Sequence, residues 1–275
     1  MSESKQKSNL EISESDHEAK RLRYKHYCRF LGRYAAYMLG CGATCIRINK
    51  NIRRIAATIG MDAHIITLPH NIIVNLSDGS DDHSYHYSCA IAKVPISYYI
   101  NTELSKLSWA MADGKVTFAE AENQMEIIVA HPRMSVWKVL VLVAVANASF
   151  CRLFGGDIAA MLIVALATAI GYSVKNLLFK AHTDDKIVWF ASATAAALVA
   201  AILSFGQMLT STPDIALATS VLFLIPGIPF IDSISDMIDG HYLCAFSRFM
   251  NATILTACIA AGLMIGFLLL NIKVL

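Results

Sequence analysis

Three aspartates follow one another in a part of the chain that is otherwise largely apolar. Asp232, Asp236 and Asp239 are spaced by four and three residues, which places their carboxylates on one face of a helix. Carboxylates this close to a membrane are usually paired, protonated or turned toward water. These three could bind a substrate ammonium group, accept a proton or pair with Arg248. A solvated loop is the alternative interpretation, and Asp236 is the favoured functional member.

A predicted helix break lies just before these carboxylates. Residues 226–229 read Pro-Gly-Ile-Pro, and proline removes a backbone donor and clashes with the preceding turn, so a regular helix cannot continue. The freed carbonyl groups need partners, and broken helices at membrane depth often line a solute path. A simple kink, or a helix that ends at the interface, is the alternative. We place a substrate or ion pathway at this break.

The C-terminal half of the chain contains five apolar stretches, and the break lies in the fourth of them. Each is about 20 residues long, the length of helix that crosses about 30 Å of hydrocarbon. Runs of this length must be helices if they span a membrane, because a helix satisfies its own backbone groups. One such run could be the core helix of a soluble protein, but five in succession favour membrane spans. The predicted spans are Val136–Phe154, Ile158–Leu178, Ile187–Phe205, Ile215–Ile231 and Phe249–Leu270.

Polar and small residues inside these spans predict helix packing. Most of the polar ones are expected to form hydrogen bonds between helices, and Asn147 and Thr194 are added to the pathway. Gly262 and Gly266 form a small-xxx-small pair that predicts a close approach to an unidentified helix. The polar set is Asn147, Ser149, Thr168, Ser192, Thr194, Gln207, Thr219, Asn251, Thr253 and Thr256.

The loop charges predict the orientation. Lys175, Lys180 and Lys186 surround the connection between the second and third spans, and Lys138 lies at the start of the first. The loops on the other side contain only Arg152. Because basic residues favour the cytoplasmic side, we expect a cytoplasmic N-terminus and an extracytoplasmic C-terminus.

The N-terminal half has the composition of a soluble α+β domain. Residues 1–20 are polar without an apolar core, which predicts a disordered tail. Residues 21–132 are expected to form the cytoplasmic domain and residues 133–275 the transmembrane domain. Within the cytoplasmic domain, we expect helices at 21–39, 43–59, 98–112 and 117–129 and strands at 64–68, 71–76 and 84–94.

Several classes of function find no support in the sequence. The net charge is only +2 and no basic patch is interleaved with aromatics, so no nucleic-acid partner is expected. The seven cysteines lack framework spacing. Cys41 and Cys45 are four residues apart, but no second pair completes a zinc site, so buried free thiols are favoured. We expect no metal, no cofactor and no enzyme activity, since no catalytic motif is found.

Three segments resemble signatures of one transporter family. Residues 42–48, Gly-Ala-Thr-Cys-Ile-Arg-Ile, are similar to the Gly-Ala-x-x-x-Arg-Val signature of the threonine/serine exporter family, and residues 154–157 resemble its Phe-Gly-Gly turn. The likeness covers residues 22–272. Its most specific block, at residues 226–248, is matched at Pro226, Gly227, Pro229, Asp236, Gly240 and Arg248.

The resemblance implies secondary transport out of the cell. Short members resemble the larger of two subunits, whose smaller membrane partner is encoded separately, and some split-subunit relatives are associated with succinate. The chain departs from the pattern at Thr44, Asp232 and Ala245, where Glu, Asn and Gly are common. Both a dicarboxylate such as succinate and the amino acids threonine and serine therefore stay open as substrates.

Together these observations predict an α-helical integral membrane protein with about five transmembrane helices and an N-terminal cytoplasmic α+β domain. We expect a multi-pass exporter subunit in the bacterial inner membrane, with a smaller membrane subunit, lipid and a small-molecule substrate as partners. The alternative is a membrane-anchored regulatory or assembly protein without its own pathway. The predicted pathway residues are Pro226, Gly227, Pro229, Asp232, Asp236, Arg248, Asn147 and Thr194.

Overall fold

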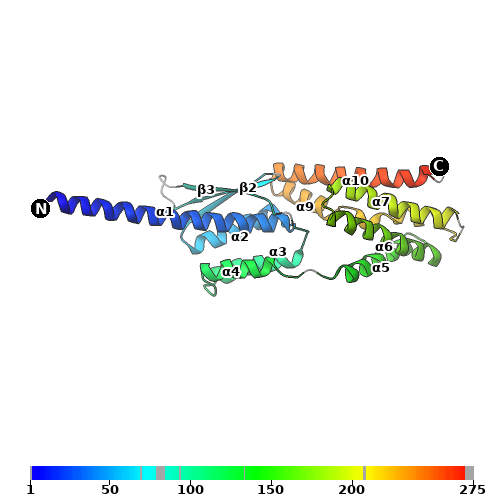
Figure 1. Ribbon diagram of the computed structural model, residues 1–275, viewed down its shortest axis with the longest axis horizontal. Coiled ribbons are helices and arrows are strands. Elements are labelled where there is room, and N and C mark those ends of the chain that lie inside the picture. Colours follow the sequence, from blue (N-terminus) through cyan, green and yellow to red (C-terminus); the bar gives the residue numbers. More distant parts are fainter. Residues whose placement is uncertain are drawn as a thin grey trace. The chain divides into compact units, whose positions relative to one another are not determined.

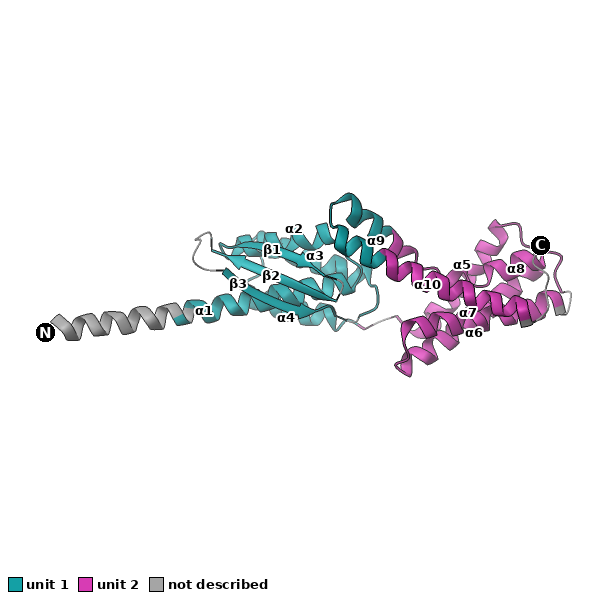
Figure 2. Ribbon diagram, turned by 90° about the horizontal axis from the view of Figure 1, so that it is seen from above, with its two compact units in different colours: residues 1–131, 231–248 teal, residues 132–230, 249–275 magenta. Residues whose placement is uncertain are grey.

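The computed structural model shows a mostly helical chain with one small antiparallel sheet (Figure 1). It describes residues 2–68, 70–78, 84–92, 94–132, 134–206 and 209–269. Contacts within the chain divide it into two compact units (Figure 2). The first unit comprises residues 1–131 and 231–248, and the second comprises residues 132–230 and 249–275.

The first unit packs helices against a three-stranded sheet. The strands pair antiparallel in chain order, so β2 is central. Ile72, Val74 and Leu76 alternate along β2 and are fully buried, because side chains two residues apart share a face. The strands are β1 (Asp62–Thr67), β2 (Asn71–Ser77) and β3 (Ser84–Ala90).

Four helices complete most of this unit. α1 packs against β2 and β3, while α2 packs against β1 and α3. Thr117 and Glu120 form a reciprocal capping box at the start of α4. Apart from the start of α1, the predicted helices and strands of this half are confirmed to within a few residues. The helices are α1 (Ser2–Gly40), α2 (Cys45–Thr58), α3 (Tyr98–Ala112) and α4 (Phe118–Val129).

Two features of this unit differ from the predicted domain organisation. α1 includes residues 2–20, the predicted disordered tail, whose order in solution stays a prediction. The predicted boundary after residue 132 lies next to the division between the units. However, residues 231–248, which we assigned to the transmembrane domain, pack with the first unit. The sequence could not show this return, because the segment lies between the fourth and fifth predicted spans and its contacts with residues 43–45 arise only from tertiary packing.

The second unit contains most of the long apolar helices. Within the described part of the chain, four helices are long and apolar enough to cross a membrane, with bounds of 136–153, 158–180, 185–205 and 242–268. These confirm four of the five predicted stretches as helices. They are α5 (Val136–Leu153), α6 (Ile158–Lys180), α7 (Asp185–Ala201) continued by the π-helix η1 (Ile202–Gly206), and α10 (Tyr242–Leu269).

The fifth predicted stretch is broken, as the Pro-Gly-Ile-Pro sequence predicts. α8 (Pro213–Thr219) and the short 3-10 helix η2 (Leu222–Leu224) are followed by α9 (Gly227–Ile238), with a bend of 59°. Pro229 lies in the first turn of α9, where a missing N–H costs no hydrogen bond within the helix. Gly227 N donates instead to Ile225 O at 2.9 Å, in a tight turn.

Asp157 ties together two loops of the second unit. Its carboxylate caps α6 through Ala160 N at 2.6 Å and also accepts from the Thr210 hydroxyl at 2.7 Å and from Ser211 N at 2.9 Å. These hydrogen bonds, led by the one from Thr210, hold the pKa of Asp157 well below its ordinary value. The Phe-Gly-Gly-Asp segment is therefore a helix start that is anchored to the loop before α8.

Candidate functional site: a buried carboxylate, arginine and thiol cluster

Asp236 is the centre of a polar cluster inside the first unit. Its side chain is fully buried, and its Oδ1 accepts a hydrogen bond from Cys45 N at 2.7 Å. Cys45 is the first residue of α2, and the N-cap residue Thr44 provides no side-chain cap. A carboxylate satisfies the free N–H groups of a helix start and favours its dipole. Asp236 on α9 therefore caps α2 from nearly two hundred residues further along the chain.

Arg248 neutralises this carboxylate. Its Nη1 lies 3.0 Å from Asp236 Oδ2 and 3.7 Å from Asp232 Oδ2, while its Nη2 donates to Ala43 O at 2.7 Å. The Nη1 contacts are ion pairs without hydrogen-bond alignment. The side chains of Asp232 and Arg248 are 13% and 16% exposed, whereas Asp236 is 0% exposed. The sequence left several roles open for these carboxylates. The structure shows one of them, an ion pair with Arg248.

Two thiols complete the cluster. Cys45 Sγ donates to Asp236 Oδ2 at 3.4 Å and accepts from the Thr67 hydroxyl at 3.4 Å. The Sγ atom of Cys244, in the first turn of α10, lies within 4.8 Å of both Cys45 Sγ and an Asp236 carboxylate oxygen. Hydrogen bonding with Cys244 and burial raise the pKa of Cys45, so this residue is a thiol at neutral pH.

The sequence analysis found part of this cluster. Asp232, Asp236 and Arg248 lie together, whereas Asp239 is exposed. Helical spacing alone could not separate Asp236 from Asp239. Cys244 and Thr67 were missed because their relation to Cys45 arises from tertiary packing. The signal that singled out Asp236 from Asp239 was the family resemblance at Asp236, Gly240 and Arg248.

The broken segment supplies a second set of polar contacts, within the second unit. Its free carbonyls have partners: Trp189 Nε1 donates to Leu224 O at 3.0 Å, and Asn147 Nδ2 donates to Thr219 O at 3.1 Å. Asn147 also donates to Thr168 Oγ1 at 2.6 Å. Asn147 is thus a buried brace between α5, α6 and α8. Nothing in the sequence marked Trp189 as a second brace.

The remaining polar residues of the spans divide into two groups. Thr194, a predicted pathway residue, donates to Phe190 O of its own helix at 2.9 Å. The Ser204 hydroxyl, in the π-helix η1, and the Asn176 amide nitrogen are buried and have no partner among the described residues. π-Helical segments occur often at functional sites. Gln207, a member of the predicted polar set, lies outside the described residues.

Loss of the Asn147 amide is expected to weaken the second unit. Asn147→Ala leaves the Thr219 carbonyl without its buried donor and should lower the free energy of unfolding by about 1–3 kcal/mol. Ser149→Ala on the same helix is the matched control, because the Ser149 hydroxyl is exposed and donates to Val145 O of its own helix. Equilibrium unfolding of the purified chain in detergent measures both, and equal transition midpoints would contradict the brace.

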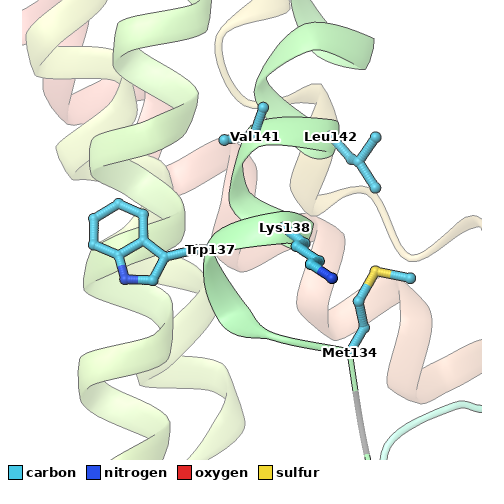
Figure 3. Close-up of a pocket in the computed structure, with 5 residues that line it drawn as sticks. All are labelled: Met134, Trp137, Lys138, Val141 and Leu142. Atoms are coloured by element: carbon cyan, nitrogen blue, oxygen red, sulfur yellow. The ribbon is translucent and has the colours of Figure 1, made fainter.

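A shallow depression lies at the start of α5 and is largely apolar. It has a volume of about 550 Å³ and is lined by Met134, Trp137, Lys138, Val141 and Leu142. Trp137 and Leu142 point to opposite sides of the helix (Figure 3), and the Trp137 side chain is 75% exposed. A tryptophan beside a lysine at a helix end is typical of membrane–water interfaces. The depression lacks the converging polar groups of a substrate site.

Comparison with known proteins identifies the class. The family model described as "Putative threonine/serine exporter" matches residues 29–270, so the chain belongs to the threonine/serine exporter family. This membership supports a transporter role. No solved structure matches the chain.

Two bacterial relatives are named as transporter subunits. The protein named "Probable succinate transporter subunit YjjP" from Escherichia coli K12 is 25% identical over 239 residues, covering 86% of this chain and 92% of that protein. The protein of the same name from Klebsiella aerogenes is 24% identical over 242 residues, covering 87% of this chain and 92% of its own length.

Proposed function

We propose that this chain is one subunit of a secondary exporter for small polar metabolites in the bacterial inner membrane. The observation that carries the proposal is the family match over residues 29–270, which spans all the apolar helices and the broken segment. Both relatives carry the name "Probable succinate transporter subunit", which supports a dicarboxylate substrate and an assembly of more than one subunit as proposals for this chain. A dicarboxylate such as succinate is the first substrate to test, and threonine and serine are the second.

The chain connectivity supports five membrane crossings. We place the first unit in the cytoplasm, because Lys175, Lys180 and Lys186 flank the connection between α6 and α7. The chain leaves this unit at residue 131 and returns to it at residue 231. A segment that starts and ends on one side crosses an even number of times. We therefore assign four crossings to α5, α6, α7 and the broken segment, and a fifth to α10.

Reporter fusions test this topology. A reporter inserted after Lys180 is expected to be cytoplasmic, and one fused after Leu275 extracytoplasmic. The two reporters distinguish the models because, among the residues that the structure describes, four helices qualify as spans by themselves and the bent pair would be the fifth. Finding both reporters in the cytoplasm would show that the bent pair is a re-entrant loop that does not cross.

The proposed pathway runs beside the break at residues 226–229. The Leu224 and Thr219 carbonyls are already occupied by Trp189 and Asn147. Substrate contact is therefore better assigned to groups with spare hydrogen-bonding capacity, Ser204 and Asn176. Asn147 and Thr194 then shape the path without binding substrate directly.

Efflux measurements with and without a partner test the function. Cells that lack the native genes are loaded with labelled succinate, threonine or serine, and release is followed with this chain alone, with the candidate smaller subunit alone, and with both. We expect succinate release only with both chains. Full release by this chain alone would contradict the two-subunit proposal. No release of any substrate by both would favour a regulatory or assembly protein.

A further inference from the structure

The thiols of Cys45 and Cys244 and the carboxylate of Asp236 are side chains of the kind that bind metal ions. Cys45 begins α2, Asp236 lies on α9 and Cys244 lies in the first turn of α10. All three are buried, and one ligand atom from each lies within 4.8 Å of the others. We propose that Cys45, Asp236 and Cys244 bind a zinc ion. The inference does not depend on the transport proposal.

The separations fit tetrahedral coordination. Zinc–sulfur bonds of about 2.3 Å and zinc–oxygen bonds of about 2.0 Å, at tetrahedral angles, place sulfur and oxygen ligands about 3.5 Å apart and two sulfurs about 3.8 Å apart. Cys45 Sγ and Asp236 Oδ2 are already 3.4 Å apart. The remaining separations are at most 4.8 Å, so a shift of about 1 Å or less completes the geometry.

The groups around the three ligands hold them in place. Thr67 donates to Cys45 Sγ, and Cys45 N donates to Asp236 Oδ1, which leaves Oδ2 facing the thiol. Such outer hydrogen bonds orient metal ligands and sustain affinity. The Arg248 ion pair to Oδ2 lacks hydrogen-bond alignment, so this oxygen keeps a lone pair for a metal.

The charges favour a divalent ion. Zinc binding replaces the two thiol protons, which are released to solvent. Two thiolates and one carboxylate then carry three negative charges, zinc contributes two positive charges, and the Arg248 guanidinium contributes one. The cluster around the ion is neutral, apart from the partly exposed Asp232. Thiolates select zinc over magnesium or calcium, which prefer oxygen ligands.

Zinc loading of the purified full-length chain tests the site. The protein is reduced, stripped with a chelator, incubated with zinc chloride and separated from free metal. The wild type is expected to retain roughly one zinc ion per chain, as three protein ligands and a water complete one tetrahedral site. The Cys45→Ser/Cys244→Ser variant should retain none. The matched control is Cys89→Ser/Cys258→Ser, which removes two partly buried thiols outside the cluster and should retain zinc as the wild type does.

Cobalt substitution gives a readout that does not need the variants to fold. Co²⁺ in the wild-type chain should show intense sulfur-to-cobalt charge-transfer absorption, which is absent from an oxygen-ligand site. No retained zinc in the wild type, equal retention in the Cys45→Ser/Cys244→Ser variant, or a cobalt complex without this absorption would each overturn the proposal. So would a disulfide between Cys45 and Cys244 in protein isolated under reducing conditions.

Discussion

Replacing Asp236 with asparagine is expected to destabilise the first unit by about 3 kcal/mol. Removing one partner from a buried ion pair usually costs 3–5 kcal/mol, because the other charge is left uncompensated. The lower end applies here, since Arg248 keeps Asp232 at 3.7 Å and the Ala43 carbonyl. Asparagine can still accept the hydrogen bond from Cys45 N. The loss of stability therefore measures the effect of removing the charge and not the loss of the helix cap.

Efflux and stability must be measured on the same preparations. If Asp236 serves only the fold, activity should fall in proportion to the amount of inserted protein. If Asp236 also serves the pathway, as the sequence analysis predicts, efflux per inserted chain should fall to background as well. Asp239→Asn is the matched control, because it removes a carboxylate from the exposed part of the same segment, and it should be milder in both assays. Normal unfolding and normal efflux in Asp236→Asn would refute both roles.

A double variant separates the ion pair from its surroundings. Arg248→Gln alone should also be destabilising, because it removes the cation beside Asp232 and Asp236. If the two charges interact directly, Asp236→Asn/Arg248→Gln should cost less than the sum of the single changes by at least about 1 kcal/mol. Additive costs would mean that the 3.0 Å contact contributes no net stability.

Local signals in the sequence were sufficient for most elements of the fold. Apolar length predicted the positions of α5, α6, α7 and α10, and two prolines predicted the break before α9. These features are set by residues within one turn or one span. The return of residues 231–248 to the first unit was not predictable in this way, since it depends on the contacts of Asp236 and Arg248 with residues 43–45.

The candidate site shows the same limit more strongly. Spacing placed three carboxylates on one helix face, but only the folded chain shows that Asp236 caps α2 while Asp239 is exposed. The sequence paired Cys45 with Cys41 and offered no second pair to complete a zinc site, because Cys244 lies far along the chain. Sequence reasoning finds ligands that share a motif, and it misses those that only tertiary packing brings together.

The glycine pair on α10 carries the other large expected effect. The sequence predicted a close helix contact without naming the partner helix, and the structure identifies it as α7. A Cβ atom built at Gly262 would lie 2.7 Å from Phe190 O and 2.9 Å from Thr194 N, and one at Gly266 would lie 2.9 Å from Ala197 Cβ. The Gly262 contacts are with two backbone atoms and the Ala193 Cβ atom, so the neighbouring helix cannot yield by a side-chain rotation.

Gly262→Ala is therefore expected to destabilise the second unit although alanine is the better helix former. Helix propensity favours the change by about 1 kcal/mol, whereas forcing a methyl group into packed backbone costs about 1–3 kcal/mol or more. The short distances indicate the upper part of that range, so a net loss of about 2 kcal/mol should remain. Ala261→Val is the control, because it adds bulk at the neighbouring exposed position. Unfolding in detergent should show a lower midpoint for Gly262→Ala and a nearly unchanged one for Ala261→Val. A gain in stability for Gly262→Ala would mean that α7 and α10 are farther apart than the structure places them.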